Sequence, residues 1–279
     1  MFRRRDRREQ VEVPVGTVPP GEEVLPGYRV VALMSHGKRI DTYDVHSQLR
    51  DCRCVVKILR ADRRDEAETA EKVLLEGRLV TELTHPHLVR GYEVHTDPAP
   101  AMVLETLTGR TLEAVITHAG LLSEADTAQL GLQLCSVLGY LHRCGWLHLD
   151  VKPANVVIEH GLATLIDLSL VSRPGAGRPG GGTVGYLAPE QVTGQGLSEA
   201  SDVWGLGITL LECVTGELAY GEEVGAEPGL LRRRRLAPPR PVRGLHPDLD
   251  EVLRACVAPD PADRPTLEQV KVVLARFGA

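Results

Sequence analysis

The sequence predicts an α+β protein in two parts: a small, β-rich N-terminal lobe with one main helix, and a larger, mainly helical C-terminal lobe. Short strand-like segments dominate between residues 28 and 106, whereas helical patterns dominate from residue 107 onward. The chain has 279 residues, of which 43% are hydrophobic and 25% are charged. This composition excludes a wholly disordered chain and is sufficient to bury a core.

Residues 1–27 are predicted to form a flexible tail, outside a folded domain that covers residues 28–276. Five arginines and one aspartate fall within the first eight residues, and a linker rich in proline and glycine follows. Nothing in this stretch is expected to pack. A solvated tail is therefore predicted, and contact with an acidic partner or an anionic lipid is the alternative.

The N-terminal lobe, about 28–106, begins with strand-like segments and continues with a helix and two further strands. The predicted strands are 28–34, 54–59, 88–95 and 101–106, and the helix is 65–83. Val73 and Val80 mark the inward face of this helix. Glu76 is three residues from one and four from the other, so its side chain is expected to point inward as well.

The C-terminal lobe, about 107–276, opens with a capping box at Ser123–Asp126 and an amphipathic helix that runs to about residue 143. Two short β segments are predicted to flank Asp167, and the glycine-rich residues 174–182 are predicted to form a flexible loop. The remaining predicted helices are 198–215, 227–235, 248–257 and 266–276.

Charge and cysteine content narrow the function classes. The formal net charge of −6 argues against general nucleic-acid binding. The longest apolar run, around Trp204–Val214, is broken by polar residues and glycines, so no membrane span is predicted. No apolar stretch follows the charged N-terminus, so no secretory signal is predicted either. The six cysteines form no C-x-x-C pair, which favours buried or half-buried free thiols and a cytoplasmic protein.

Polar residues interrupt apolar segments at three places. Lys57 lies inside a strand-like run, Asp167 lies inside another, and Asp150, Lys152 and Asn155 crowd one turn. A buried lysine needs a partner, and the inward Glu76 is available. Carboxylates that are buried beside a lysine and an asparagine suggest a bound divalent metal with a phosphate. Structural ion pairs are the alternative for each group taken singly.

The segment HLDVKPAN, from His148 to Asn155, resembles the H-R-D-x-x-x-x-N catalytic loop of protein kinases. Further motifs follow in the family's order: C-V-V-K at 54–57, Glu76 ahead of His85-Pro86, D-L-S at 167–169, G-T-V-G-Y-L-A-P-E at 182–190, S-D-V-W-G at 201–205, and the late Arg264. The resemblance covers about 28–276 and is greatest to the bacterial eukaryotic-like (Hanks-type) serine/threonine kinases. It implies the two-lobed protein kinase fold.

The resemblance also implies the roles of individual residues. Lys57, held by Glu76, would bind the α- and β-phosphates of ATP, and Asn155 and Asp167 would hold Mg²⁺ or Mn²⁺. Asp150 would accept the proton of the attacking hydroxyl, while Lys152 would neutralise the γ-phosphate. The implied adenine and loop contacts are Gly37, Val55, and the backbone groups of Glu105, Thr106 and Leu107, after a gatekeeper Leu104. Thr183 would belong to the substrate segment and, with Lys152, indicates serine or threonine rather than tyrosine as the acceptor.

The family's glycine-rich loop is degenerate in this sequence. Ser35 and Ile40 replace its first and third glycines, and only Gly37 remains. Because glycine allows close backbone approach to phosphate, we predict weak or differently posed ATP binding. A pseudokinase that acts as a binding or scaffold module is therefore the alternative to a protein serine/threonine kinase. Phosphoryl transfer to a small molecule is a third reading, which the protein-substrate segment at 182–190 disfavours.

Two further features bear on regulation and partners. Leu149 replaces the arginine of H-R-D, which in the family reads a phosphate on the activation loop, and residues 174–182 contain no Ser, Thr or Tyr. We hypothesise that phosphorylation in this segment does not switch the protein. The basic run Arg232, Arg233, Arg234 and Arg235 is either a solvated charge run or a docking site for an acidic protein segment.

Overall fold

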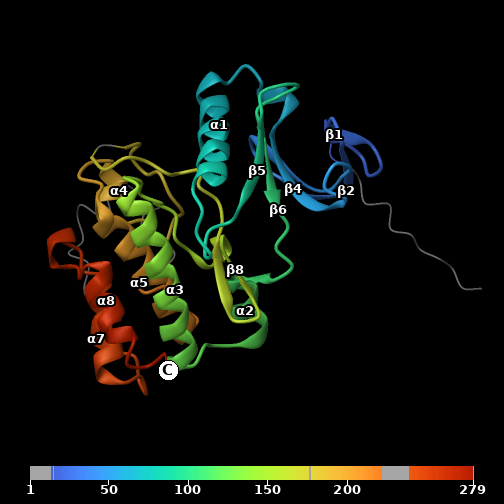
Figure 1. Cartoon of the computed structure of the whole chain (residues 1–279). Helices are drawn as coiled ribbons and strands as arrows, with labels where there is room; N and C mark the ends of the chain where they lie inside the picture. Colours follow the sequence, from blue (N-terminus) through green and yellow to red (C-terminus); the bar gives the residue numbers. More distant parts are fainter. Residues whose placement is uncertain (1–13, 15, 176, 222–238, 279) are drawn as a thin grey trace, which may run out of the picture. The chain divides into compact units, whose positions relative to one another are not determined.

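The computed structural model describes residues 14, 16–175, 177–221 and 239–278 (Figure 1). Their contacts divide the chain into two compact units. The first unit comprises Met1–Glu82 and Arg90–Thr106, and the second comprises Leu83–Val89 and Leu107–Ala279. The α+β prediction is confirmed, because the first unit is built on a sheet and the second is mainly helical.

The first unit contains an antiparallel sheet in the order β1-β2-β3-β4-β6-β5. Its strands are β1 (Glu23–Leu25), β2 (Tyr28–His36), β3 (Ile40–Ser47), β4 (Cys52–Leu59), β5 (Gly91–His95) and β6 (Ala101–Glu105). Alternate residues of β3 are buried, as the twofold period of a strand requires. Tyr43, Val45, Val56 and Val103 are almost fully buried in the core of this unit.

The structure corrects the predicted tail at its C-terminal end. β1 pairs with β2, and Val24 and Leu25 are buried in the core. Val18 packs against the same core, and its backbone N–H donates to the Tyr43 hydroxyl at 3.0 Å. The apolar side chains of this short segment therefore bury against the sheet. Residues 1–13 lie outside the described part of the chain, so the tail prediction there stays a prediction.

One helix, α1 (Ala67–Glu82), packs against β5, β6 and β4 (Figure 1). A short 3₁₀ turn, η1 (Ala61–Arg63), precedes it. Val73, Glu76 and Val80 are each at most 2% exposed, so the predicted inward face is confirmed, including its carboxylate. Glu76 lies three residues after Val73 and four before Val80, and this spacing predicted its place on the apolar face although it is charged.

The second unit consists of helices and a small sheet of β7 (Arg110–Thr111), β8 (Val156–Glu159) and β9 (Leu162–Leu165). Its helices are α2 (Leu112–Ala119), α3 (Glu124–Arg143), α4 (Pro189–Thr193), α5 (Glu199–Thr215), α7 (Pro247–Cys256) and α8 (Leu267–Leu274), with 3₁₀ turns η2 (Pro153–Asn155) and η3 (Pro261–Asp263). α5 is buried over most of its length and contacts α3 and α7. The Ser123 hydroxyl caps α3, as predicted.

The second unit departs from the predicted pattern around Asp167 and in the loop 174–182. β8 and β9 both precede Asp167, so this residue is not flanked by two strands; the chain after it contributes the isolated bridge between Ser172 and Leu147. The predicted loop 174–182 is tied down by backbone hydrogen bonds, among them a pair between Gly175 and Leu197 at 2.8 Å. The predicted helix 227–235 lies outside the described residues.

Candidate active site

A buried aspartate shapes the loop that carries the polar cluster of the second unit. Asp202, in the first turn of α5, accepts hydrogen bonds from the backbone N–H groups of His148 at 2.9 Å and Leu149 at 2.7 Å, and contacts His142 Nε2 at 2.7 Å. The His148 ring is fully buried, and burial lowers its pKa. Its Nδ1 accepts from the Asp150 N–H at 3.2 Å, which fixes a neutral tautomer. Two buried side chains therefore hold the backbone that leads into Asp150.

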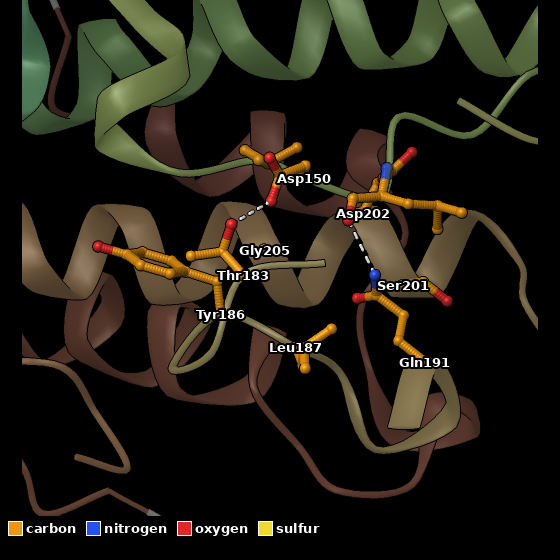
Figure 2. Close-up of a pocket in the computed structure, with 10 residues that line it drawn as sticks. Asp150, Thr183, Tyr186, Leu187, Gln191, Ser201, Asp202 and Gly205 are labelled. Carbon is orange, nitrogen blue, oxygen red and sulfur yellow. Dashed lines mark hydrogen bonds between the residues drawn. The ribbon is translucent and has the colours of Figure 1, made fainter. Parts of the chain in front are cut away.

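The side chains of Asp150, Lys152 and Thr183 form a closed triangle of hydrogen bonds. Figure 2 shows one of its sides, the bond between Asp150 and Thr183. Lys152 Nζ donates to Asp150 Oδ2 at 2.7 Å and to Thr183 Oγ1 at 2.6 Å. The Thr183 hydroxyl donates to Asp150 Oδ1 at 2.7 Å. A carboxylate, an ammonium and a hydroxyl thus meet although they are spread over 33 positions of the sequence. Charge-assisted bonds of this length are among the stronger hydrogen bonds in proteins.

Asn155 is fixed beside this triangle by its amide nitrogen. Nδ2 donates to the backbone oxygen of Asp150 at 2.9 Å and to its Oδ2 at 2.8 Å. Because Nδ2 is the group that makes these two bonds, Oδ1 is the atom that the side chain can offer to a cation. The side chain is buried, so its orientation is set by the η2 turn rather than by solvent.

Asp167 lies immediately after a contact with Asn155. The Ile166 N–H donates to the Asn155 backbone oxygen at 2.8 Å, which places the next residue, Asp167, beside the η2 turn. Asp167 adopts a left-handed φ of 71°, and its Oδ1 accepts from the Ser169 N–H at 3.0 Å. Leu168 is buried, as expected for a residue that fills an apolar slot.

These two residues fit a magnesium ion. Mg²⁺ prefers oxygen ligands and is commonly held by one or two protein side chains together with substrate phosphates. One carboxylate and one carboxamide, on segments joined by a hydrogen bond, match that ligand set. Across the described ranges, no cluster of three His, Cys, Asp or Glu side chains suits a metal.

The segment around Thr183 is held by Gln191, a residue that sequence analysis missed. Gln191 Nε2 donates to the backbone oxygen of Leu149 at 2.8 Å and to that of Gly181 at 3.0 Å. Leu149 itself is 8% exposed and clusters with Leu147 and Leu197. Apolar packing and a neutral side chain therefore join the two segments, with no charged group at the Leu149 position.

One buried contact and one half-buried contact support the same segment. Arg264 donates to the Glu190 carboxylate through Nη1 at 2.7 Å and Nη2 at 3.0 Å, which is a bidentate ion pair. The Tyr186 hydroxyl donates to Glu212 Oε2 at 2.6 Å. Burial, together with the nearby charge of Glu113, raises the pKa of Glu212. These contacts hold the segment on the C-terminal side of Thr183.

In the first unit, Lys57 of β4 and Glu76 of α1 form the ion pair that the sequence suggested. Nζ donates to Oε1 at 2.9 Å, and the two side chains are 16% and 2% exposed. The pair joins the middle of the sheet to the inward face of the helix. Lysine presents its charge as a compact point, which suits an interaction with phosphate oxygens.

The β2–β3 hairpin occupies the place of the expected glycine-rich loop. Its turn is closed by a hydrogen bond from the Gly37 N–H to the Ile40 oxygen at 3.0 Å. A Cβ atom at residue 37 would lie 2.7 Å from that oxygen, so glycine is required there. Ser35 pairs with Thr42, and Ile40 pairs with Leu59 as the first residue of β3. Ile40 therefore extends a strand rather than adopting a glycine-like backbone.

The residues expected to surround adenine are divided between the units. Val55 of β4 pairs with the buried Leu104 of β6. The Glu105 N–H donates to the Arg90 oxygen at 3.0 Å, and Glu105 Oε1 accepts from the Arg90 N–H at 2.8 Å. Leu107 belongs to the second unit.

The predicted basic run lies beyond the described residues; it consists of Arg232, Arg233, Arg234 and Arg235. The neighbouring Arg240 and Arg243 are exposed.

The six cysteines are free thiols, and Cys52 is exposed, unlike the burial predicted for it. In the part of the chain that the structure describes, no helix combines the length and apolarity needed to cross a bilayer.

Comparison with known proteins agrees with these geometric observations. The family model described as the protein kinase domain matches residues 28–273. The chain is 27% identical over 213 residues to serine/threonine-protein kinase PrkC of Bacillus subtilis, with 73% of this chain and 32% of the relative covered. It is 30% identical to PkaA of Streptomyces coelicolor, with 77% and 41% covered, and 30% identical to PknB of Mycobacterium leprae, with 75% and 36% covered. The matched part thus spans less than half of each relative's length.

Proposed function

The chain belongs to the protein kinase family, and from this we propose that it transfers the γ-phosphoryl group of ATP to a serine or threonine hydroxyl of a protein substrate. The observation that carries the proposal is the triangle of Asp150, Lys152 and Thr183. It shows that the Asp150 carboxylate can hold a hydroxyl group at 2.7 Å with an ammonium beside it. The matched relatives carry serine/threonine-protein kinase in their names.

The mechanism assigns each polar group a defined task. Asp150 orients the acceptor hydroxyl and accepts its proton as the oxygen attacks the γ-phosphorus. Lys152 lies within 2.7 Å of that carboxylate, so its charge can neutralise the transferred phosphoryl group. Thr183 positions both side chains through its single hydroxyl. Most of the rate enhancement then comes from positioning and fixed charges rather than from a covalent intermediate.

Nucleotide binding is assigned to two sets of residues. Lys57, oriented by Glu76, binds the α- and β-phosphates, while Gly37, Val55 and the backbone groups of Glu105 and Leu107 contact the rest of ATP. Asn155 and Asp167 would hold Mg²⁺, or Mn²⁺ in its place. When bound there, the ion would supply positive charge that neutralises the phosphates.

The degenerate hairpin favours one alternative, a pseudokinase that binds partners without turnover. Two of the three glycine positions carry Ser35 and Ile40, and Ile40 is committed to β3. Against this alternative, the six polar side chains expected to act on ATP and acceptor are present, and Asp150 is hydrogen-bonded to both Lys152 and Asn155. The matched relatives also favour the enzyme.

The cytoplasmic location and a docking partner are proposed from the free thiols and the basic run. Free thiols fit a reducing cytoplasm. Arg232, Arg233, Arg234 and Arg235 are proposed to dock an acidic protein segment. A variant with these four arginines changed to alanine should then phosphorylate an acidic partner more slowly at low salt and equally at high salt. Equal rates at low salt would contradict the docking role.

The test of the activity is single-turnover transfer from γ-³²P-labelled ATP with Mg²⁺. Serine, threonine and tyrosine peptide libraries are offered separately, beside a set of small-molecule alcohols. Label on the serine and threonine peptides, absent with Lys57→Met, supports the proposal. Label on the small molecules alone would assign a different acceptor class. No label on any acceptor, with nucleotide bound, would establish the pseudokinase.

A further inference from the structure

The tip of the β2–β3 hairpin is held by an arginine from outside the hairpin. Arg60 follows β4 directly, and its Nη1 donates to the Gly37 backbone oxygen at 2.9 Å and contacts His36 Nε2 at 2.8 Å. The Arg60 N–H also donates to the Arg39 backbone oxygen at 2.9 Å. Three contacts from one residue therefore reach three of the residues that make the turn.

Asp62 fixes the orientation of the Arg60 guanidinium. Nε donates to Asp62 Oδ1 at 2.9 Å and Nη2 donates to Oδ2 at 3.0 Å, which is a bidentate pair. The planar guanidinium has a fixed donor geometry, so binding Asp62 along one edge directs the hydrogens of Nη1 to the hairpin. The bond from Arg60 lowers the pKa of Asp62, as expected for a carboxylate held in its charged form.

The contact with Arg60 also fixes the state of His36. A guanidinium only donates hydrogen bonds, so His36 Nε2 must accept and the ring must be neutral. Nδ1 then carries the proton and donates to Asp41 Oδ1 at 2.7 Å. Asp41 is 3% exposed and stands opposite His36 in the strand register. Asp62, Arg60, His36 and Asp41 thus form a continuous chain of side chains, here called the hairpin clamp.

A second bond ties the same tip to the residues after β4. Arg39 Nε donates to Glu66 Oε2 at 2.8 Å, although both side chains are partly exposed. Such an exposed pair contributes little alone. Together with the hairpin clamp, it means that both sides of the turn are anchored to residues 60–66.

We propose that Arg60 is a positioning residue that holds the β2–β3 hairpin in one conformation for nucleotide binding. This inference rests on the proposed function, because it assigns the hairpin to the ATP phosphates. Glycines let a loop adapt to phosphate, whereas this hairpin retains one glycine and gains side-chain anchors. A preorganised loop loses less conformational entropy on binding, which compensates for the missing glycines.

The test compares Arg60→Ala with Arg53→Ala as the matched control. Arg53 lies on β4, the strand that Arg60 follows, and pairs with Asp44 of β3, so its removal makes the same charge change away from the turn. Hydrogen–deuterium exchange of residues 36–41 is measured without nucleotide, and ATP affinity is measured by titration with Mg²⁺. Arg60→Ala should exchange about tenfold faster in this peptide and bind ATP about threefold to tenfold more weakly. Arg53→Ala should match the wild type in both measurements.

An NMR measurement and a lysine variant make the test specific for the Arg60 side chain. Imidazole ¹⁵N spectra should show His36 as the Nδ1–H tautomer in the wild type and should change in Arg60→Ala. Arg60→Lys keeps the positive charge but loses the planar guanidinium and its paired N–H donors, so it should recover only part of the ATP affinity. Wild-type exchange rates in Arg60→Ala would overturn the hairpin clamp. Faster exchange with unchanged ATP affinity would overturn the positioning role and leave the proposed function standing. Absence of ATP binding by the wild type would overturn the positioning role and the proposed function together, whatever the exchange shows.

Discussion

The catalytic loop and the β2–β3 hairpin both depart from the family pattern, but in different ways. In the catalytic loop, leucine replaces the arginine at position 149, while Asp150, Lys152 and Asn155 remain, and Asp150 is hydrogen-bonded to the other two. In the hairpin, two glycines are changed, and contacts from Arg60 hold the turn. The loop keeps its charged and polar atoms, whereas the hairpin changes how its backbone is held.

This difference separates two kinds of requirement. A proton acceptor or a metal ligand must present a particular atom, and no neighbouring contact can supply it. A backbone conformation can be stabilised in several ways, by glycine or by side-chain hydrogen bonds. The structure therefore favours an active enzyme with an unusual nucleotide loop over an inactive scaffold. The following predictions test each side of this comparison.

The largest expected effect is on the catalytic loop. Asp150→Asn keeps the shape of the side chain but removes the proton acceptor, so the turnover number should fall about 10²- to 10⁴-fold. ATP affinity should stay within about threefold of the wild-type value. Steady-state kinetics and nucleotide titration measure the two quantities separately. Turnover within tenfold of wild type would show that Asp150 is not the base.

A charge at position 149 should unfold the protein more easily. Leu149 is 8% exposed among Leu147 and Leu197, so Leu149→Arg places a guanidinium among apolar side chains. The free energy of unfolding should fall by about 2–4 kcal/mol, whereas Leu149→Met should cost less than about 1.5 kcal/mol. Urea denaturation measures both. An arginine variant as stable as the wild type would mean that the surroundings of residue 149 accommodate a charged side chain. The segment could then bind a phosphate through an arginine at this position.

The hydroxyl of Thr183 should matter for rate more than for folding. Thr183→Val removes the donor to Asp150 and the acceptor for Lys152, and the turnover number should fall about 10- to 30-fold. Thr183→Ser restores the hydroxyl and serves as the control, with turnover expected within about threefold of wild type. Equal turnover of the valine and serine variants would exclude a role for the Thr183 hydroxyl.

The smallest effect concerns Glu212, whose pKa is raised mainly by burial. A carboxyl with a raised folded pKa stabilises the protein below its unfolded pKa, and this stability is lost as pH rises through the folded pKa. Glu212→Gln should therefore raise the free energy of unfolding slightly at pH 7, by less than ~1 kcal/mol because the group is half-buried, and thermal melts measure this change. The gain should shrink toward zero near pH 4. A gain that grows on acidification would contradict the raised pKa.

Much of the fold followed from local patterns. Helix α3 begins after the predicted Ser123 cap, and the spacing of Val73, Glu76 and Val80 identified the inward face of α1. The β1 strand was missed because three residues between prolines and glycines give no periodic signal. Its burial depends on the edge that β2 offers, which is a tertiary property.

The site was predictable where spacing within one segment defines it. Asp150, Lys152 and Asn155 fall in one loop, so their proximity could be read from the sequence. The contacts of Gln191 and Arg60 could not, because Gln191 and in part Arg60 bind backbone oxygens of distant residues, which leave no mark in a sequence. A polar residue that ends a strand, such as Arg60, is the one signal that was available.

The most direct test of the central claim is the Tm of the whole chain with and without saturating Mg²⁺ and ATP. The account predicts binding despite the two replaced glycines, because Lys57, Asn155 and Asp167 remain. Ligand at about 100 times its Kd adds about 2.7 kcal/mol, which is a shift of several degrees for a protein of this size. The shift should require Mg²⁺ and should disappear in Asp167→Asn. No shift at millimolar ATP, or an equal shift in that variant, would contradict the account.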